Sequence, residues 1–165
     1  MTRVLRLTLV LVIAVSTALL LGTGVSLPPE VASHFGHSGA ADGWMSRTAY
    51  LCLMTALVAV LPLFLAATSG LLPKWSRRNR LMRHPEYWLA PPRRAATEAF
   101  LESYACAFGI ALCLFMLGMH FLLIEANALT PPRLPMHAFF AVLGVFGAVV
   151  VALLAALFVR FRAIG

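Results

Sequence analysis

Charged residues are scarce in this sequence, and acidic residues are the scarcest of all. Only 12% of the 165 residues are Asp, Glu, Lys or Arg, whereas 61% are hydrophobic. A soluble globular domain carries about a quarter charged residues, so the composition excludes an ordinary soluble domain and is typical of a membrane protein. The length is enough for one compact unit and too short for two ordinary domains, which predicts that residues 1–165 form a single domain.

Cysteine is also rare, and its positions exclude the usual cysteine sites. Cys52, Cys106 and Cys113 all lie within apolar stretches, and no C-x-x-C pair is present. Cys106 and Cys113 fall on one predicted helix with their Cα atoms about 10 Å apart, which is too far for a disulfide. We interpret all three cysteines as small buried hydrophobic residues.

Motifs of known chemistry are missing as well. The sequence contains no nucleophile–base pairing, phosphate-binding loop, dinucleotide-binding fingerprint or haem motif. We therefore expect no enzymatic activity and no cofactor. The net charge of +7 would suit nucleic acid, but the basic residues stand between hydrophobic segments, which is the pattern of orientation signals. We expect no nucleic-acid partner.

Four hydrophobic segments are long enough to cross a membrane as helices. About 20 helical residues span a hydrocarbon core roughly 30 Å thick. The predicted spans are residues 4–27, 48–72, 99–127 and 136–158. The predicted fold class is therefore all-α, an integral membrane four-helix bundle in which Pro62 disturbs the second helix. The first segment is longer than the apolar part of a signal peptide and no clean Ala-x-Ala site follows it, so we interpret it as a retained helix.

The basic residues are divided unequally between the connecting segments. Of the thirteen Lys and Arg residues, eleven lie near the two termini or within residues 73–97, whereas segments 28–47 and 128–135 hold one each. The positive-inside rule then places both termini and residues 73–97 in the cytoplasm. We predict a multi-pass protein of the bacterial cytoplasmic (inner) membrane, with a structured extracytoplasmic loop after the first helix.

That outer loop, residues 28–47, contains three residues of types that bind metals. His34, His37 and Asp42 could offer two imidazoles and a carboxylate to zinc, which would suit a membrane metalloenzyme. The H-x-x-H spacing, with glycines beside it, does not fit a helical metal site, so we expect no metal.

The alternative interpretation of the same loop is a structured turn. In it Asp42 closes the turn, Gly43 adopts a positive φ and Trp44 anchors the loop at the outer membrane interface.

Three ionisable residues are the candidates for an intramembrane site. His120 and Glu125 lie in the third predicted span and His137 at the start of the fourth. A charge at the bilayer centre costs roughly 3 kcal/mol or more, so such residues mark functional sites by default. Glu125, His137 and His34 could gather beneath the outer loop, either as a proton- or ligand-linked site or as ordinary interfacial pairs.

Two further features leave alternatives open. The basic segment 73–97 either binds anionic lipid or an acidic partner, or serves only to set the topology. Gly144 and Ala148 form a small-xxx-small pair in the fourth span, which suits packing within the bundle and dimerisation equally well. The oligomeric state therefore stays open.

Two stretches resemble a known family. LPPEVASHFG, from Leu27, followed by GAADGWMSR, which ends at Arg47, resembles the signature LP..I..HF...G..DGW..K/R of a bacterial membrane-protein family of unknown function. EYWLAPPRR, residues 86–94, resembles a segment of short family members. The same domain forms the N-terminal part of SdpI-type immunity proteins, which protect cells from a secreted toxic peptide and signal its presence. Those proteins carry a further multi-span domain for which this chain is too short, so the resemblance implies family membership rather than immunity itself.

The resemblance also implies a shared outer-loop element. Its members here are His34, Gly39, Asp42, Gly43, Trp44 and Arg47. We expect a non-enzymatic protein with an envelope-sensing, immunity or accessory role, whose outer loop meets another membrane protein or a peptide at the lipid bilayer. The alternative is an oligomeric small transporter or channel subunit, with His120, Glu125 and His137 lining a polar path.

Overall fold

Long helices make up most of the structure. The computed structural model describes residues 2–69 and 84–162. Within these residues, four helical stretches are long and apolar enough to cross a membrane. They are α1 (Thr2–Gly24), the continuous run of α2, η1 and α3 (Arg47–Thr68), α6 (Pro91–Asn127) and α7 (Met136–Phe161). The chain therefore has the architecture of a multi-pass membrane protein, as its hydrophobic pattern predicts.

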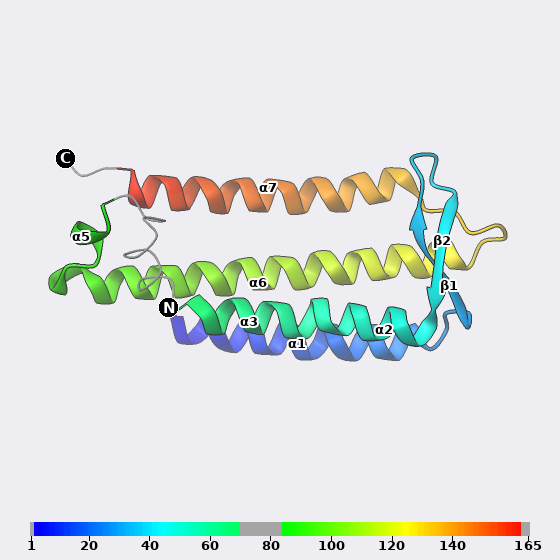
Figure 1. The fold of residues 1–165 in the computed structure, drawn as a ribbon, viewed down its shortest axis with the longest axis horizontal. Helices are drawn as coiled ribbons and strands as arrows, with labels where there is room; N and C mark the ends of the chain where they lie inside the picture. The colour runs from blue at the N-terminus through cyan, green and yellow to red at the C-terminus, as the bar shows by residue number, and fades with distance from the viewer. Residues whose placement is uncertain (1, 70–83, 163–165) are drawn as a thin grey trace.

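The long helices lie side by side, with α6 between α7 and the pair formed by α1 and the α2–α3 run (Figure 1). α1 and α6 run in the same direction, because Arg6 contacts Glu102 near one end and Thr23 contacts His120 near the other. Two ends can thus be distinguished. The hairpin end holds residues 30–46, and the basic end is where α1 begins and α7 ends (Figure 1).

The second span is not a regular α-helix. It consists of α2 (Arg47–Thr55), one π-helical turn η1 (Ala56–Val60) and α3 (Leu61–Thr68). Pro62 has no N–H and cannot bond to the carbonyl of Val58, four residues earlier. The thiol of Cys113 on α6 donates to that carbonyl instead, with an S···O distance of 3.2 Å. The proline predicted to disturb this span is therefore accommodated by a neighbouring helix.

The segment after α1 contains a β-hairpin, so the all-α prediction needs correction. Strands β1 (Glu30–Phe35) and β2 (Ala41–Ser46) form a two-stranded antiparallel sheet whose register shifts on both sides of His34. The glycines and polar residues that indicated a loop lie at the tip and at these irregular positions. The strands are short and the buried residues Val31 and Ala32 are adjacent, so the alternation typical of a strand is hidden.

The third span begins earlier than predicted. α6 starts at Pro91 rather than near residue 99, with prolines in its first turn, where a helix needs no N–H donors. Its 37 residues are many more than the roughly 20 that cross a hydrocarbon core, so its first turns extend beyond the apolar layer. Residues 73–83 of the predicted basic segment, and the predicted end of the second span at residue 72, lie outside the described residues.

Ion pairs and aromatic contacts hold the helices together at the basic end. Arg6 of α1 pairs with Glu102 of α6. The guanidinium of Arg160 on α7 lies over the ring of Trp88, 4.5 Å from its centroid. Trp88 belongs to the short helix α5 (Pro85–Trp88). This end is therefore fixed mainly by residues that can also reach the headgroup layer.

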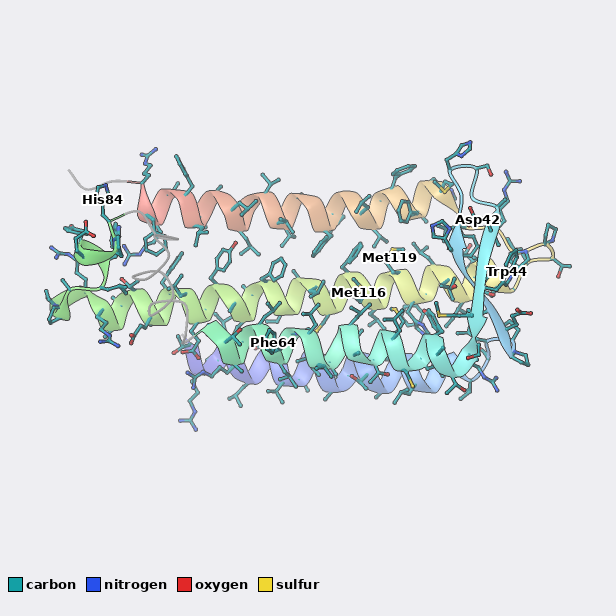
Figure 2. All side chains as sticks on the ribbon, viewed as in Figure 1. Asp42, Trp44, Phe64, His84, Met116 and Met119 are labelled. Atoms are coloured by element: carbon teal, nitrogen blue, oxygen red, sulfur yellow. The ribbon has the colours of Figure 1, made fainter. Side chains whose placement is uncertain are left out.

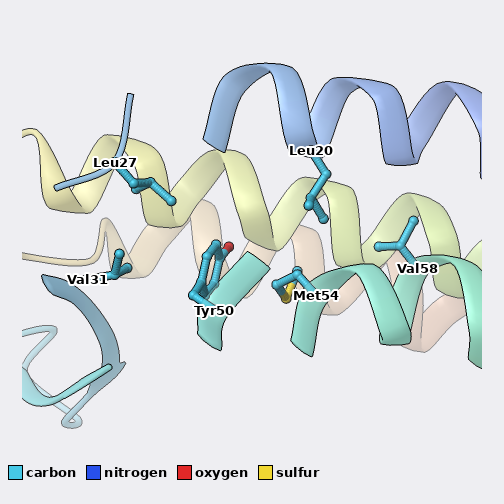
Figure 3. Packing of buried hydrophobic residues seen from close by; sticks show 6 residues of the cluster. All are labelled: Leu20, Leu27, Val31, Tyr50, Met54 and Val58. Atoms are coloured by element: carbon cyan, nitrogen blue, oxygen red, sulfur yellow. The ribbon is translucent and has the colours of Figure 1, made fainter. Parts of the chain in front are cut away.

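A buried hydrophobic cluster lies near the hairpin end. Buried residues of α1, the connection that follows it, the hairpin and the second span meet there (Figure 3): Leu20, Leu27, Val31, Tyr50, Met54 and Val58. This cluster attaches the hairpin to the helices. α7, in contrast, has no buried residue and packs mainly against α6. A Cβ built on Gly144 would meet no other element of the described residues within 4 Å, and Ala148 is exposed, so this small pair makes no close helix contact there.

Candidate functional site

Arg47 joins the hairpin to the end of α1. Its Nη1 atom donates hydrogen bonds to the carbonyl oxygens of Val25 and Leu27, at 3.0 and 2.9 Å. Its backbone N–H donates to the carbonyl of Pro29 at 2.9 Å. Carbonyl groups just beyond a helix lack intrahelical partners, and a guanidinium can satisfy two of them at once. The predicted ligand-binding residue Arg47 thus makes contacts within the chain.

Asn127 joins the hairpin to the end of α6. Its side-chain oxygen accepts from the N–H of Ala32 at 2.8 Å, and its amide nitrogen donates to the carbonyl of the same residue at 3.0 Å. The side chain therefore pairs with β1 much as a neighbouring strand would. Sequence reasoning missed this residue, although an asparagine at the end of an apolar span is a signal that its amide has a partner.

Gly39 joins the hairpin tip to the turn between α6 and α7. Its carbonyl accepts from the N–H of Leu134 at 2.8 Å, and its φ is +79°. A Cβ at this position would lie 2.7 Å from the carbonyl oxygen of Leu134. The positive φ predicted for Gly43 is therefore found at Gly39. Gly43 is needed for another reason, because a Cβ there would lie 3.0 Å from Cβ of His34 on the opposite strand.

The remaining members of the outer-loop element are His34, Asp42 and Trp44, and they lie on the outer surface of the hairpin. Figure 2 shows Asp42 and Trp44 on the hairpin, at the end of the molecule. Nδ1 of His34 and a carboxylate oxygen of Asp42 form a hydrogen-bonded pair across the strands, and both side chains are largely exposed. Trp44 is 52% exposed, which is unusual for so large an apolar side chain. Trp44 and the His34–Asp42 pair thus give the hairpin an exposed surface with an aromatic ring and a polar pair.

The proposed zinc ligands do not come together as a set. Within the part of the chain that the structure describes, no three His, Cys, Asp or Glu side chains are close enough to hold a metal ion. His34 and Asp42 pair with each other, and His37 lies exposed near the hairpin tip, outside this pair.

His120 lies fully buried between three helices and both of its ring nitrogens are hydrogen-bonded. Nε2 lies 2.9 Å from the Thr23 hydroxyl of α1, and Nδ1 lies 2.9 Å from the Tyr50 hydroxyl of α2. Thr23 donates its only hydroxyl proton to the carbonyl of Leu19, at 2.6 Å. It must therefore accept from Nε2–H, and the unprotonated Nδ1 accepts from the Tyr50 hydroxyl. A neutral imidazole thus satisfies every polar atom of this triad.

Glu125 and His137 occupy a different place from His120. Both line an open cleft of about 320 Å³ at the hairpin end, bounded by the end of α6, the start of α7 and the hairpin tip. Arg133 and Ser38 line the same cleft, whereas His34 and His120 do not. The structure therefore brings together two of the three predicted intramembrane residues and keeps the third sealed among helices.

Comparison with known proteins gives one match. Residues 9–60 match the model of a family described as "Domain of unknown function (DUF1648)". The matched stretch contains most of α1, the whole hairpin and most of the second span, and so includes every predicted member of the outer-loop element. No curated protein and no solved structure matches the chain.

Proposed function

We propose that this chain is a non-enzymatic protein of the bacterial cytoplasmic membrane that recognises a peptide or another membrane protein through the outer face of its hairpin. The role would be envelope sensing, immunity or that of an accessory subunit. The observation that carries the proposal is that the hairpin is fixed from three sides and still leaves Trp44 and the His34–Asp42 pair exposed.

Rigid attachment favours recognition because it lowers the entropy lost on binding. Arg47, Asn127 and Gly39 each hold a different part of the hairpin. Tryptophan is one of the residue types enriched among the side chains that contribute most to binding at protein interfaces. Among the residues that the structure describes, the sheet has two strands and no further strand pairs with β2, so an extended peptide could pair with its other side.

The distribution of basic residues supports an outward-facing hairpin. The termini and residues 73–97 hold eleven of the thirteen Lys and Arg residues, and the positive-inside rule keeps such segments in the cytoplasm. A secreted peptide would then meet the hairpin first. The resemblance to the N-terminal part of SdpI-type immunity proteins, whose signature falls on this hairpin, supports the same class of partner.

The proposal is tested by complementation of a deletion strain under envelope-stress and toxic-peptide conditions. The variants are Trp44→Ala and, as a matched control, Val25→Ala, which also shortens an exposed apolar side chain at the hairpin end. We expect Trp44→Ala to lose protection or signalling by about tenfold or more, since an interface tryptophan contributes roughly 2 kcal/mol or more. Val25→Ala should behave as wild type at equal membrane levels.

Full activity of a protein that carries both Trp44→Ala and Asp42→Asn would contradict the proposal. So would full activity after replacement of residues 36–45 by a Gly/Ser linker, provided that the protein still inserts.

A further inference from the structure

Two hollows follow one another along the seam between α6 and α7. The first, which we call the seam groove, has a volume of about 390 Å³ and only apolar lining residues, including Leu114, Gly118 and Val145. The second is the hairpin-end cleft described above, lined by Glu125, Arg133 and His137 among others.

The groove and the cleft lie on the same side of the seam. On α6, Ala111 and Gly118 line the groove and Glu125 lines the cleft, and these positions follow one another at a spacing of seven. On α7, His137 lines the cleft and Ala141, four residues on, lines the groove. Spacings of four and seven keep helical residues on one face, so the groove leads towards the cleft.

Position along the helices places the two hollows at different depths. The cleft lies where α6 ends, at Asn127, and where α7 begins, at Met136. Apolar spans end at the headgroup layer, so the cleft belongs to that layer. The groove lies within the apolar part of both helices and opens towards the acyl chains. A polar cleft above an apolar groove is the arrangement that an amphiphile requires.

The charges of the cleft do not neutralise one another. Glu125 forms no ion pair with any residue in the described ranges 2–69 and 84–162. Arg133 lines the same cleft, and its guanidinium donates one long hydrogen bond, of 3.4 Å, to the carbonyl of Ser38. A carboxylate and a guanidinium that share a cleft without pairing fit a ligand that carries both an ammonium and an anionic group.

We propose that the α6–α7 seam binds a phospholipid with a phosphoethanolamine headgroup. The lipid ammonium group donates to the Glu125 carboxylate, and the phosphate accepts from the Arg133 guanidinium and from the imidazole N–H of His137. An acyl chain fills the seam groove. An anionic glycerol headgroup offers no cation to Glu125, and a choline headgroup has no N–H to donate. This site requires membrane insertion, and it does not depend on what the hairpin recognises.

Native mass spectrometry of the purified full-length protein tests the headgroup contacts. The protein is exposed to equal amounts of phosphatidylethanolamine, phosphatidylglycerol and phosphatidylcholine with identical acyl chains. We expect phosphatidylethanolamine to be retained preferentially, and Glu125→Gln to weaken its retention about tenfold or more through loss of a charge-assisted hydrogen bond. The matched control is Glu30→Gln, which neutralises an exposed carboxylate at the same end but outside the cleft, and it should retain the lipid as wild type does.

Ala141→Phe tests the groove, because its ring would occupy the space of the acyl chain. The matched control is Val151→Phe, which adds the same ring to an exposed position outside the groove. We expect only Ala141→Phe to reduce lipid retention. Ala141 is itself exposed, so the variant should fold, and an unchanged thermal unfolding midpoint verifies this.

Several outcomes would overturn the proposal. Equal retention of the three lipids, or equal effects of Glu125→Gln and Glu30→Gln, would exclude headgroup recognition. Competition by soluble phosphoethanolamine, with no effect of Ala141→Phe, would identify a free small molecule as the ligand. If the wild-type protein is a dimer, and Ala141→Phe converts it to a monomer without changing lipid retention, the groove binds a second copy of the chain instead.

Discussion

His120 uses both ring nitrogens to hold two other helices, and the apolar surroundings make each of these bonds hard to replace. The donors and acceptors are matched only when the imidazole is neutral and its proton lies on Nε2. Sequence reasoning identified His120 as an unusual residue in a membrane span. It could not identify Thr23 and Tyr50 as its partners, because both are far from it along the chain.

Tyr50→Phe should destabilise the protein by about 1 kcal/mol. The substitution keeps the ring but leaves Nδ1 of His120 buried without a donor. Tyr104→Phe is the control, since the Tyr104 hydroxyl makes no hydrogen bond to a residue in the described segments, and it should be close to neutral. Reversible unfolding in detergent measures both, and equal stabilities of the two variants would show that the bond contributes nothing.

Gly39→Ala should detach the hairpin tip and cost about 2 kcal/mol or more. The new Cβ combines an unfavourable positive φ with a contact of 2.7 Å to the Leu134 carbonyl oxygen. Gly22→Ala provides the comparison, because nothing lies within 4 Å of its Cβ and the helix gains a better helix former. Limited proteolysis of the hairpin should accelerate only in Gly39→Ala, and resistance equal to that of wild type would contradict the assignment.

The motif residues therefore divide into two groups. Gly39, Gly43 and Arg47 make contacts that build the hairpin and fix it to the helices. Trp44 and the His34–Asp42 pair remain exposed. The sequence alone presents these residues as one set, because a linear motif does not separate side chains that shape a surface from those that lie on it.

At the scale of elements, a backbone hydrogen bond that the second span lacks is replaced by a side chain of α6. Pro62 leaves the Val58 carbonyl without its usual donor, and the Cys113 thiol replaces that donor from α6. The prediction that the cysteines are small buried residues is confirmed for Cys106 and Cys113, and Cys113 also donates this hydrogen bond. The prediction is wrong for Cys52, which is exposed.

A double-mutant cycle should detect coupling between Pro62 and Cys113 of about 0.5–1 kcal/mol. Cys113→Ala should be costly in the wild type and less costly beside Pro62→Ala, which restores a backbone donor to the second span. Cys106→Ala is the control, because Cys106 is buried on the same helix but has no such bond within the described residues. A cost of Cys113→Ala that is the same in both backgrounds would show that the thiol acts by packing alone.

Hydrophobic run length predicts the helices well and their ends poorly. Each of the four apolar segments contains a helix, because backbone groups in lipid have few alternatives to helical bonding. α6 begins eight residues before the predicted start at residue 99, since charged and proline residues continue the helix beyond the apolar layer. The hairpin was missed because its strands are short, interrupted by glycine and stabilised by helix ends far away in sequence.

At the scale of the whole molecule, the two ends differ in chemistry. The hairpin end carries the exposed tryptophan and the mixed-charge cleft, and the basic end carries arginines in ion pairs and over aromatic rings. The positions of Lys and Arg in the sequence predict this difference between the ends. Such a count can be made without knowing which residues are in contact. The hairpin-end cleft was anticipated only in part, since Arg133 and Ser38 become neighbours of Glu125 only through the fold.

The proposed orientation predicts opposite labelling of two cysteine variants. Ser38→Cys at the hairpin tip should react with a membrane-impermeant maleimide in intact spheroplasts, and Ala95→Cys near the start of α6 should react only after lysis. Both positions are exposed and uncharged, so neither substitution alters the distribution of basic residues. Labelling of Ala95→Cys alone in intact spheroplasts would reverse the orientation.

The parallel pairing of α1 with α6 has a consequence for the order in which the chain is made. Consecutive spans of a chain that crosses the bilayer back and forth are antiparallel, so two parallel helices cannot be consecutive. The second span is therefore synthesised before α6, the helix that pairs with α1. Until then the Tyr50 hydroxyl lacks its acceptor, and Thr23 can bond only to its own helix. The arrival of His120 supplies the missing partner, so the three helices can become a unit only after residue 120 has been synthesised.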